Sequence, residues 1–305
     1  MKIVALAGGV GGAKFADGLA QILPPGDLTV IVNTGDDFEH YGLYICPDLD
    51  TVCYTLAGMA NPDTGWGRVD ETWNVIENAA RLGGPAWFRL GDRDLGTHLE
   101  RTRRLREGQS LSKITEVFCQ AWGITQKVLP MSNQPVRTIV ETGDGDLAFQ
   151  EYFVHRRCEP PVKGFRFEGL ETAEPAPGVN EALQSADALI ICPSNPWVSI
   201  DPILRVIGRI EKPVLAISPI IAGQTVKGPA AKMYRELGIE PSAVAVARHY
   251  CDLASGFVFD ELDKQLQGEI GLLGMRMLVT NTLMKSHDNR KQLAMDVLDF
   301  IGREL

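Results

Sequence analysis

A glycine-rich segment directly after a short apolar run is the feature that most constrains the fold of this chain. Residues 2–7 (KIVALA) are branched and apolar, and residues 8–14 read GGVGGAK. An apolar run that ends in glycines is typical of a buried parallel strand followed by a strand-to-helix turn. We expect a helix over 15–23, a stop at 24–26 (PPG) and a second buried strand over 28–33. This succession has the spacing of a doubly wound α/β fold.

Three later apolar runs repeat the pattern of a short buried strand followed by a polar turn. They cover residues 188–192, 214–218 and 243–247, and each is expected to add a strand to a mainly parallel sheet. Together these elements predict a Rossmann-like three-layer α/β sandwich. In such sheets ligands bind at the carboxyl ends of the strands, so the residues after each run are the candidates for a site.

The middle of the chain has another pattern, which predicts a smaller α+β lobe inserted into the core. Residues 111–122 carry apolar side chains at helical spacing, and the runs 136–140 and 147–154 flank a turn with two glycines, as in a hairpin. The proline-rich stretch 159–178 is typical of a connector back to the main sheet. The resulting domain assignment is a nucleotide-binding core of residues 1–84 and 171–305 and an inserted lobe of residues 85–170.

Composition narrows the class of protein. With 45% apolar and 23% charged residues, the 305-residue chain has the make-up of an ordinary soluble enzyme. Its net charge of −9 argues against non-specific binding of nucleic acid, so a phosphate site must gather its own positive charge or a metal. No apolar segment reaches the roughly 20 residues that span a bilayer, and the apolar start is too short for a signal peptide. We therefore expect a cytoplasmic protein that does not bind membranes.

The glycine-rich segment is a candidate phosphate site. Glycines let backbone N–H groups approach a phosphate closely, and the N-terminus of the next helix adds a favourable dipole. The segment is neither a Walker A loop nor GxGxxG, since Lys14 stands where the third glycine of the latter belongs. A glycine-rich turn needed only for packing is the alternative. The predicted nucleotide contacts in this segment are Gly8, Gly9, Gly11, Gly12 and Lys14.

Four aspartates lie within fifteen residues after the second predicted strand, in the motifs NTGDD and CPDLDT. Adjacent carboxylates repel each other unless a cation or hydrogen-bond donors offset their charge. Mg²⁺ prefers carboxylate oxygens together with phosphates and waters. We therefore predict a magnesium site from Asp36, Asp37 and Asp50, with helix capping or a solvated turn as the alternative.

Small hydroxyl and amide side chains follow two of the later runs, in PSNP (193–196) and SPIIAGQ (218–224). Such side chains read a nucleobase or ribose edge where proline keeps the loop rigid, although ordinary turns use the same residues. The predicted nucleotide contacts at strand ends are Asn33, Ser194, Asn195, Ser218 and Gln224.

An arginine stands among aromatic and charged residues in the segment 87–94 (WFRLGDRD). The Arg89 guanidinium is suited to pair with a phosphate or to stack on a ring. A structural cluster of ion pairs explains the same pattern equally well.

Taken together, these segments resemble the 2-phospho-L-lactate transferase (CofD) family of coenzyme F-420 biosynthesis. In chain order the motifs are GGVGGAK, NTGDD, CPDLDT, GWGRVDETW, FRLGDRDLGTH, PSNP, SPIIAGQTVKGPA and ARHY. The set is specific, although no single member is. A related group of CofD-like regulatory proteins, which are linked to sugar-nucleotide binding, shares the core, but those proteins usually open with a GGGTG-type loop, which is missing here.

The resemblance implies an enzyme that moves a phospho-carboxylate unit from a guanosine-diphosphate-activated donor to a deazaflavin alcohol. The acceptor is the ribityl hydroxyl of 7,8-didemethyl-8-hydroxy-5-deazariboflavin, and GMP is released. The resemblance also implies deazaflavin contacts at Asp50 and Arg89, a Mg²⁺ cofactor and a homodimer. Phosphoryl transfer depends on placement and charge neutralisation. We therefore predict Asp50, Asp37 and Lys14 as catalytic residues, with Asp50 orienting or deprotonating the acceptor hydroxyl.

Two other functions compete with this one. A non-catalytic CofD-like sugar-nucleotide-binding regulator is disfavoured by Asp50 and the Arg89 segment. A dinucleotide-dependent oxidoreductase is disfavoured because GxGxxG is missing and the second strand ends in Asn33 rather than in an acid. The residues do not decide whether the transferred unit comes from 2-phospholactate, phosphoenolpyruvate or 3-phosphoglycerate.

Overall fold

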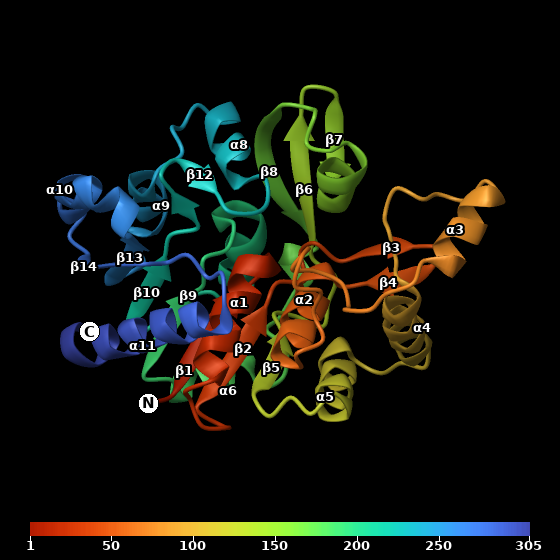
Figure 1. The fold of residues 1–305 in the computed structure, drawn as a ribbon, viewed down its shortest axis with the longest axis horizontal. Helices are drawn as coiled ribbons and strands as arrows, with labels where there is room; N and C mark the ends of the chain where they lie inside the picture. The colour runs from red at the N-terminus through yellow and green to blue at the C-terminus, as the bar shows by residue number, and fades with distance from the viewer.

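Seven parallel strands form the central sheet of the protein, which the computed structural model describes over all 305 residues (Figure 1). They lie in the order β14-β13-β10-β9-β1-β2-β5, and every neighbouring pair is parallel. Counted 1 to 7 in chain order, the strands lie 3-2-1-4-5-6-7, which is the Rossmann order with one strand added at the edge. The predicted mainly parallel α/β sheet is confirmed. The bounds are β1 (Ile3–Ala7), β2 (Leu28–Val32), β5 (Lys127–Pro130), β9 (Ala188–Ile191), β10 (Val214–Ile217), β13 (Gly256–Asp260) and β14 (Arg276–Thr280).

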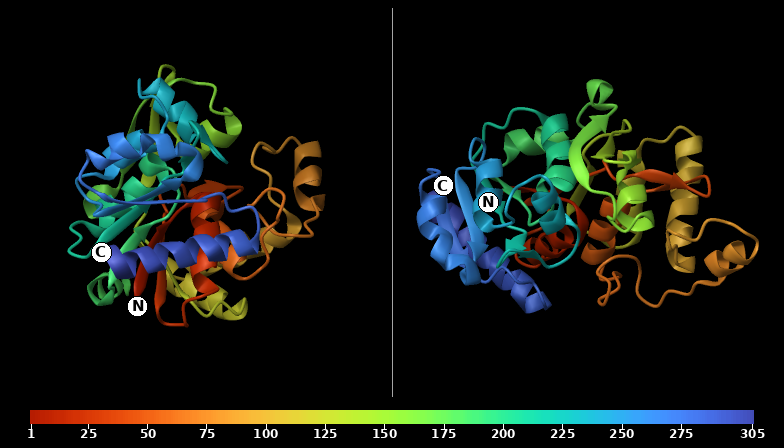
Figure 2. Two further views of the ribbon diagram at one scale, coloured as in Figure 1. Left: turned by 60° about the vertical axis from the view of Figure 1, so that its left-hand side comes forward. Right: turned by 90° about the horizontal axis from the view of Figure 1, so that it is seen from above.

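Helices cover both faces of the sheet and make it the middle of three layers (Figure 2). Alternate side chains of β1 face opposite sides, because strand side chains alternate. Ile3, Ala5 and Ala7 join one buried cluster of 29 residues, and Val4 and Leu6 join another of 32. The cluster of 29 residues is covered by α1 (Gly9–Ala20), α2 (Pro47–Leu56), α5 (Leu111–Ala121) and α11 (His287–Glu304), and the cluster of 32 by α6 (Val179–Ser185), α7 (Asp201–Ile207), α8 (Ala230–Glu236), α9 (Ala243–Tyr250) and α10 (Gln267–Gly271).

None of the helices is long and apolar enough to cross a membrane.

Two smaller units lie outside the three layers. One is an antiparallel sheet in the order β7-β6-β8, which contains the predicted hairpin, although its second strand ends at Ala148 and most of the rest of the predicted run 147–154 forms the helical turn η1. The other combines the hairpin β3–β4 with α3 and α4 and projects sideways from the core, at the right of Figure 1. The bounds are β3 (Phe38–His40), β4 (Leu43–Ile45), α3 (Asn74–Arg81), α4 (Asp92–Arg106), β6 (Arg137–Thr142), β7 (Gly145–Ala148) and β8 (Val162–Glu168), with β11 (Ile220–Ile221), β12 (Gln224–Thr225) and the short helical turns η1 (Glu151–His155), η2 (Leu170–Thr172), η3 (Pro196–Ile200) and η4 (Glu261–Leu266) between the larger elements.

The predicted strand over 243–247 is wrong, because these residues open helix α9. The Ser242 hydroxyl accepts a hydrogen bond from the backbone N–H of Ala245 at 3.1 Å and so caps the helix. A short run of alanines and valines suits a buried helix as well as a buried strand, and its periodicity does not separate the two. The strand expected there is supplied by β13, thirteen residues further along.

Two strands occupy segments for which other roles were predicted. β5 lies within the segment 85–170 but pairs with β2 at the edge of the central sheet, so part of the predicted lobe belongs to the core. β8 lies within the predicted connector 159–178 and completes the small sheet by pairing with β6. The prolines of the connector flank β8 rather than interrupt it, as proline requires.

Candidate active site

A cavity of about 790 Å³ opens at the carboxyl ends of the central strands, around the switch point between β1 and β9. Segments that follow β1, β2, β9, β10 and β14 line it, together with parts of α2 and α4 and the loop around residues 87–89. The structure thus gathers the strand ends at which ligand-binding residues were predicted. Ten predicted site residues line the cavity: Gly8, Gly9, Gly11, Lys14, Asp36, Asp50, Arg89, Ser194, Asn195 and Ser218.

The glycine segment forms the first turn of α1, so the helix begins six residues earlier than predicted and ends at Ala20. Gly9 has φ +62°, a left-handed conformation that favours glycine. A Cβ on Gly11 would lie 2.1 Å from the Pro193 carbonyl oxygen, which leaves no room for a side chain. The N-terminus of a twelve-residue helix therefore lines the cavity, where the helix dipole favours an anionic ligand.

Gly12 and Asn33, two predicted nucleotide contacts, lie behind the cavity wall. A Cβ on Gly12 would lie 2.7 Å from the Ser194 hydroxyl, so this glycine allows α1 and the loop after β9 to approach. The Asn33 amide donates to Asp48 Oδ2 at 2.9 Å and to the Val198 carbonyl at 3.1 Å. Both residues support the site without lining it.

Asp48 lines the cavity at the N-terminus of α1, although sequence reasoning gave it no role of its own. Its Oδ1 accepts the backbone N–H of Gly9 at 2.8 Å. Burial raises the pKa of Asp48 to about 6, although the hydrogen bonds from Asn33 and Gly9 lower it in part. The place of Asp48 in the CPDLDT motif was the available indication.

The two adjacent aspartates after β2 occupy different environments. Asp36 lines the cavity, and its Oδ1 is buried without a hydrogen-bond partner. Burial, followed by the charges of Asp48 and Asp37, raises the pKa of Asp36 well above its usual value. Asp37 does not line the cavity, and both of its oxygens are buried without a partner. The arrangement brings Asp36 and Asp48 together at the cavity and leaves Asp37 behind it.

Stability should depend on pH through Asp37. Burial raises the pKa of Asp37 to about 7, while the Arg137 charge partly opposes the shift. Because the folded pKa lies above the unfolded value near 3.8, folded protein holds a proton that unfolded chain releases between about pH 4 and 7. Asp37 therefore lowers the free energy of unfolding as pH rises through this window, by up to about 4 kcal/mol.

Chemical denaturation of wild type and Asp37→Asn in chelator at pH 4 and pH 8 tests this expectation. The variant should match wild type at pH 4 and be the more stable protein at pH 8. A difference between the two proteins that stays constant with pH would contradict the expectation.

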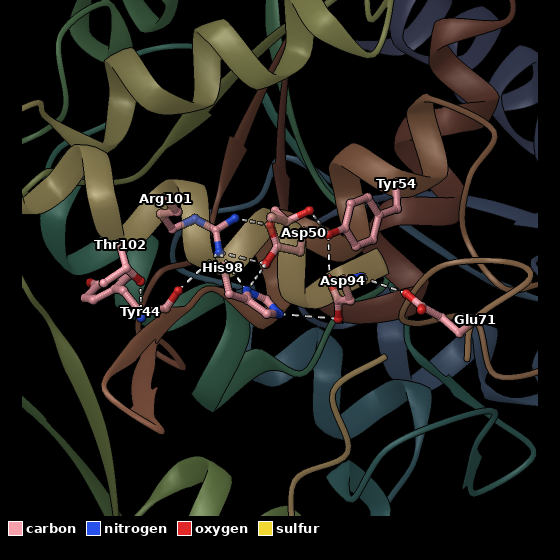
Figure 3. A network of polar contacts seen from close by, with 9 residues as sticks. Tyr44, Asp50, Tyr54, Glu71, Asp94, His98, Arg101 and Thr102 are labelled. Carbon is pink, nitrogen blue, oxygen red and sulfur yellow. Dashed lines mark hydrogen bonds and ion pairs between the residues drawn. The ribbon is translucent and has the colours of Figure 1, made fainter. Parts of the chain in front are cut away.

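Asp50 lies in a network that joins α2 to one face of α4 (Figure 3). Both Asp50 oxygens accept hydrogen bonds from the guanidinium of Arg101, one of them at 3.0 Å. His98 lies between the two carboxylates of the network, with Nδ1 3.7 Å from Asp50 and Nε2 3.4 Å from Asp94. The Tyr54 hydroxyl donates to Asp94 at 2.6 Å. Four of these five residues line the cavity, and Arg101 is buried behind them.

Three side-chain cations reach the cavity in this acidic protein. Lys14 donates to the Met284 carbonyl at 3.2 Å, and burial, followed by the charges of Arg290 and Lys227, lowers its pKa. Lys227 donates to the Asp63 carbonyl at 3.2 Å. The Arg89 guanidinium lies over the Trp73 ring, 4.2 Å from its centroid. None of the three forms an ion pair with a carboxylate, so each has charge to offer an anionic ligand.

Aromatic side chains also line the cavity, and their flat faces are suited to stack on a planar ring system. Most of them come from residue 66 and the segments 87–88 and 149–153. Besides Tyr54, the aromatic lining residues are Trp66, Trp87, Phe88, Phe149 and Phe153.

The loops after β9 and β10 present small polar side chains that are tied to backbone. Ser194 Oγ donates to the Gly8 carbonyl at 2.8 Å, and Asn195 Oδ1 accepts the backbone N–H of Trp197 at 3.1 Å. Ser218 Oγ donates to the Ile220 carbonyl at 2.9 Å. These bonds hold the loops in shape at the cavity wall. Gln224, also predicted to bind nucleotide, is exposed on β12 and does not line the cavity.

A Rossmann-like sheet with the N-terminus of its first helix, carboxylates and aromatic side chains around one cavity is typical of the class of enzymes that act on nucleotides. The sequence profile of "2-phospho-L-lactate transferase CofD" matches residues 3–268. The chain therefore belongs to the 2-phospho-L-lactate transferase (CofD) family. It is a transferase of coenzyme F-420 biosynthesis, as the resemblance of the motifs implied, and the non-catalytic alternative is not favoured.

Individual relatives of the chain are also named as transferases of this kind. The phosphoenolpyruvate transferase of Streptomyces griseus is 45% identical, with 98% of both chains covered. The 2-phospho-L-lactate transferase of Methanosarcina mazei is 39% identical, covering 96% of this chain and 98% of its own. A crystal structure of a UPF0052 family protein from Bacillus halodurans superposes with a TM-score of 0.64 at 15% identity, covering 97% of this chain and 99% of its own. That likeness shows the shared fold alone.

Proposed function

We propose that the enzyme joins a guanylylated phospho-acid donor to the terminal ribityl hydroxyl of a deazaflavin within this cavity and releases GMP. The observation that carries the proposal is one cavity that is lined by the N-terminus of α1, by aromatic side chains and by carboxylates. The helix N-terminus, Lys14 and Lys227 suit the diphosphate of the donor. The aromatic side chains and Arg89 suit the deazaflavin ring.

The reaction requires that the two substrates are held in line and that the negative charge on the phosphates is neutralised. The acceptor hydroxyl attacks the phosphorus nearest the acid, an O–P bond forms, and the bond to the GMP oxygen breaks. Asp50 is placed to accept a hydrogen bond from the attacking hydroxyl, whose proton must leave as the bond forms. Lys14 is placed to offset negative charge on the departing GMP.

The direct test is incubation of the protein with deazaflavin, a guanylylated phospho-acid and Mg²⁺, followed by chromatographic detection of GMP. Release of GMP that requires the deazaflavin supports the proposal. Binding of the donor without GMP release, with every phospho-acid tried, would instead favour a regulator.

The carboxylates of Asp36 and Asp48, near the N-terminus of α1, are suited to bind Mg²⁺. Asp36 carries a buried oxygen without a partner, and its neighbour Asp48 adds a second carboxylate, so a divalent cation would relieve their repulsion. Ligand atoms of Asp50, Asp94 and His98 also lie within 4.8 Å of one another, but Arg101 already neutralises Asp50. We therefore favour Asp36 and Asp48 over the predicted set of Asp36, Asp37 and Asp50. When bound there, Mg²⁺ would neutralise phosphate charge.

Removal of divalent cations should abolish turnover. We expect chelation with EDTA to reduce GMP release to background, since the acidic cluster alone repels the diphosphate, and added Mg²⁺ to restore it. An Asp36→Asn variant should require a higher Mg²⁺ concentration for half-maximal rate, at least about tenfold. An exposed-site variant, Asp144→Asn, serves as control. Unchanged rates in EDTA would contradict this expectation.

The transferred acid is proposed to be the phosphoenolpyruvate unit, because relatives named phosphoenolpyruvate transferase reach 45% identity and the 2-phospho-L-lactate transferase 39%. Mass spectrometry separates the products, since an enolpyruvyl product has two hydrogens fewer than a lactyl product. A preference for the lactyl or glyceryl donor in competition would overturn this assignment. A homodimer and a cytoplasmic location stay predictions.

A further inference from the structure

Helix α4 presents three polar side chains along one buried face. Asp94, His98 and Arg101 are spaced four and three residues apart, so they stack on the same side of the helix. Arg101 is only 1% exposed, although arginine is almost never fully buried without a partner. The burial of Arg101 is therefore explained by the groups that its guanidinium contacts.

The guanidinium of Arg101 holds the carboxylate of Asp50. It forms two hydrogen bonds to the two Asp50 oxygens, in the fork geometry that fixes the plane of a carboxylate. It also donates to the Tyr44 carbonyl at 3.4 Å and packs on the Phe118 ring, 5.8 Å from the centroid. These contacts fix the arginine from three elements, β4, α2 and α5. Each carboxylate oxygen keeps a lone pair for a ligand in the cavity.

The same guanidinium determines which ring nitrogen of a neutral His98 carries the proton. An arginine N–H lies 3.2 Å from His98 Nδ1, and because arginine only donates, Nδ1 must accept. The ring proton of a neutral His98 is then on Nε2, which faces Asp94. Asp94 also accepts from Tyr54, and these contacts outweigh the effect of burial and lower its pKa. The carboxylates of Asp50 and Asp94 thus lie on either side of His98 at the cavity wall, each held by hydrogen bonds from a neighbouring side chain.

We propose that Arg101 is a positioning residue of the transfer reaction, which acts through Asp50 to hold the hydroxyl-binding carboxylate of the acceptor site. Arg101 itself does not line the cavity, so it touches no substrate. The proposal rests on the proposed function, because it assigns the hydroxyl of the acceptor to Asp50. It differs from a purely structural ion pair between α2 and α4 in what it predicts for kinetics.

The test compares steady-state kinetics of wild type with Arg101→Met, Asp50→Asn and the double variant. We expect Arg101→Met to lower kcat/KM for the deazaflavin by at least about 100-fold while the KM for the donor changes less than about twofold. The double variant should be no more than about threefold worse than Asp50→Asn alone, since both changes remove one interaction. Losses that multiply would show that Arg101 acts independently of Asp50 and would overturn the proposal.

Arg101→Lys keeps the charge but not the two-pronged geometry, so it remains informative if Arg101→Met does not fold. We expect a partial loss, at least fivefold in kcat/KM for deazaflavin, with the donor KM again near wild type. Wild-type acceptor kinetics, or equal losses toward donor and acceptor, would overturn the proposal. Arg103→Met is the matched control, because Arg103 lies on the same helix but forms its ion pairs at the surface.

A binding measurement separates failure of this proposal from failure of the proposed function. Titration of the protein with the fluorescent deazaflavin alone reports acceptor affinity without turnover. If wild type binds the deazaflavin but releases no GMP with any donor, the proposed reaction fails. If wild type turns over and Arg101→Lys is indistinguishable from it, only the positioning role fails.

Discussion

Asp50→Asn is expected to lower turnover at saturating deazaflavin by about 10²–10⁴-fold, the range that a positioned group acting on a reacting proton supplies. Asp50 lines the cavity beside Asp94 and Tyr54, and its side chain is only 8% exposed. An amide keeps the shape but brings an N–H group to face Arg101 and lacks the charge that attracts the acceptor hydroxyl. Measurement of GMP release across a deazaflavin titration checks the expectation.

The same substitution should also lower stability. It leaves the Arg101 charge buried without a counter-ion, and breaking one partner of a buried ion pair costs about 3–5 kcal/mol. Chemical denaturation alongside kinetics separates the two effects, with Asp144→Asn as an exposed control. Near-normal turnover of folded Asp50→Asn at saturating deazaflavin would show that the carboxylate has no essential part in the chemistry.

Gly11→Ala is expected to cause the second large effect, on donor binding. The new methyl group would lie 2.1 Å from the Pro193 carbonyl oxygen, which belongs to backbone and cannot rotate away. The first turn of α1 must therefore separate from the loop after β9, which moves the helix N-terminus that we propose binds the diphosphate of the donor. We expect a loss of about 1–3 kcal/mol in stability, as for overpacked sites, and a rise of at least tenfold in donor KM.

Gly96→Ala is the matched control for Gly11→Ala. Gly96 lies inside α4, and a Cβ there meets nothing within 4 Å. Alanine should be neutral or stabilising at that position by up to about 1 kcal/mol, because it favours the helix. A Gly11→Ala variant with the donor KM of Gly96→Ala would contradict the role assigned to the glycine turn.

Local patterns predicted the parts of the fold that local physics decides. The runs ending at Ala7 and Asn33 are buried strands because branched apolar residues followed by glycines or polar turns have few other stable conformations. The order of these elements was enough to place the strand ends at one edge and hence to gather eight of the ten predicted residues around one cavity, the other two being Asp50 on α2 and Arg89. Where local signals were ambiguous, as over 243–247, the neighbouring cap and packing decided for a helix.

The sequence by itself therefore determined the parallel sheet, the glycine turn at the N-terminus of α1 and the motifs that mark the family. Only the tertiary structure decided what each acidic residue does, because that depends on the neighbours that other elements bring. Asp36 and Asp37 are adjacent in the chain, yet one lines the cavity and the other is buried behind it. Asp50 and Arg101 are 51 residues apart, and their contact exists only because α4 packs beside α2.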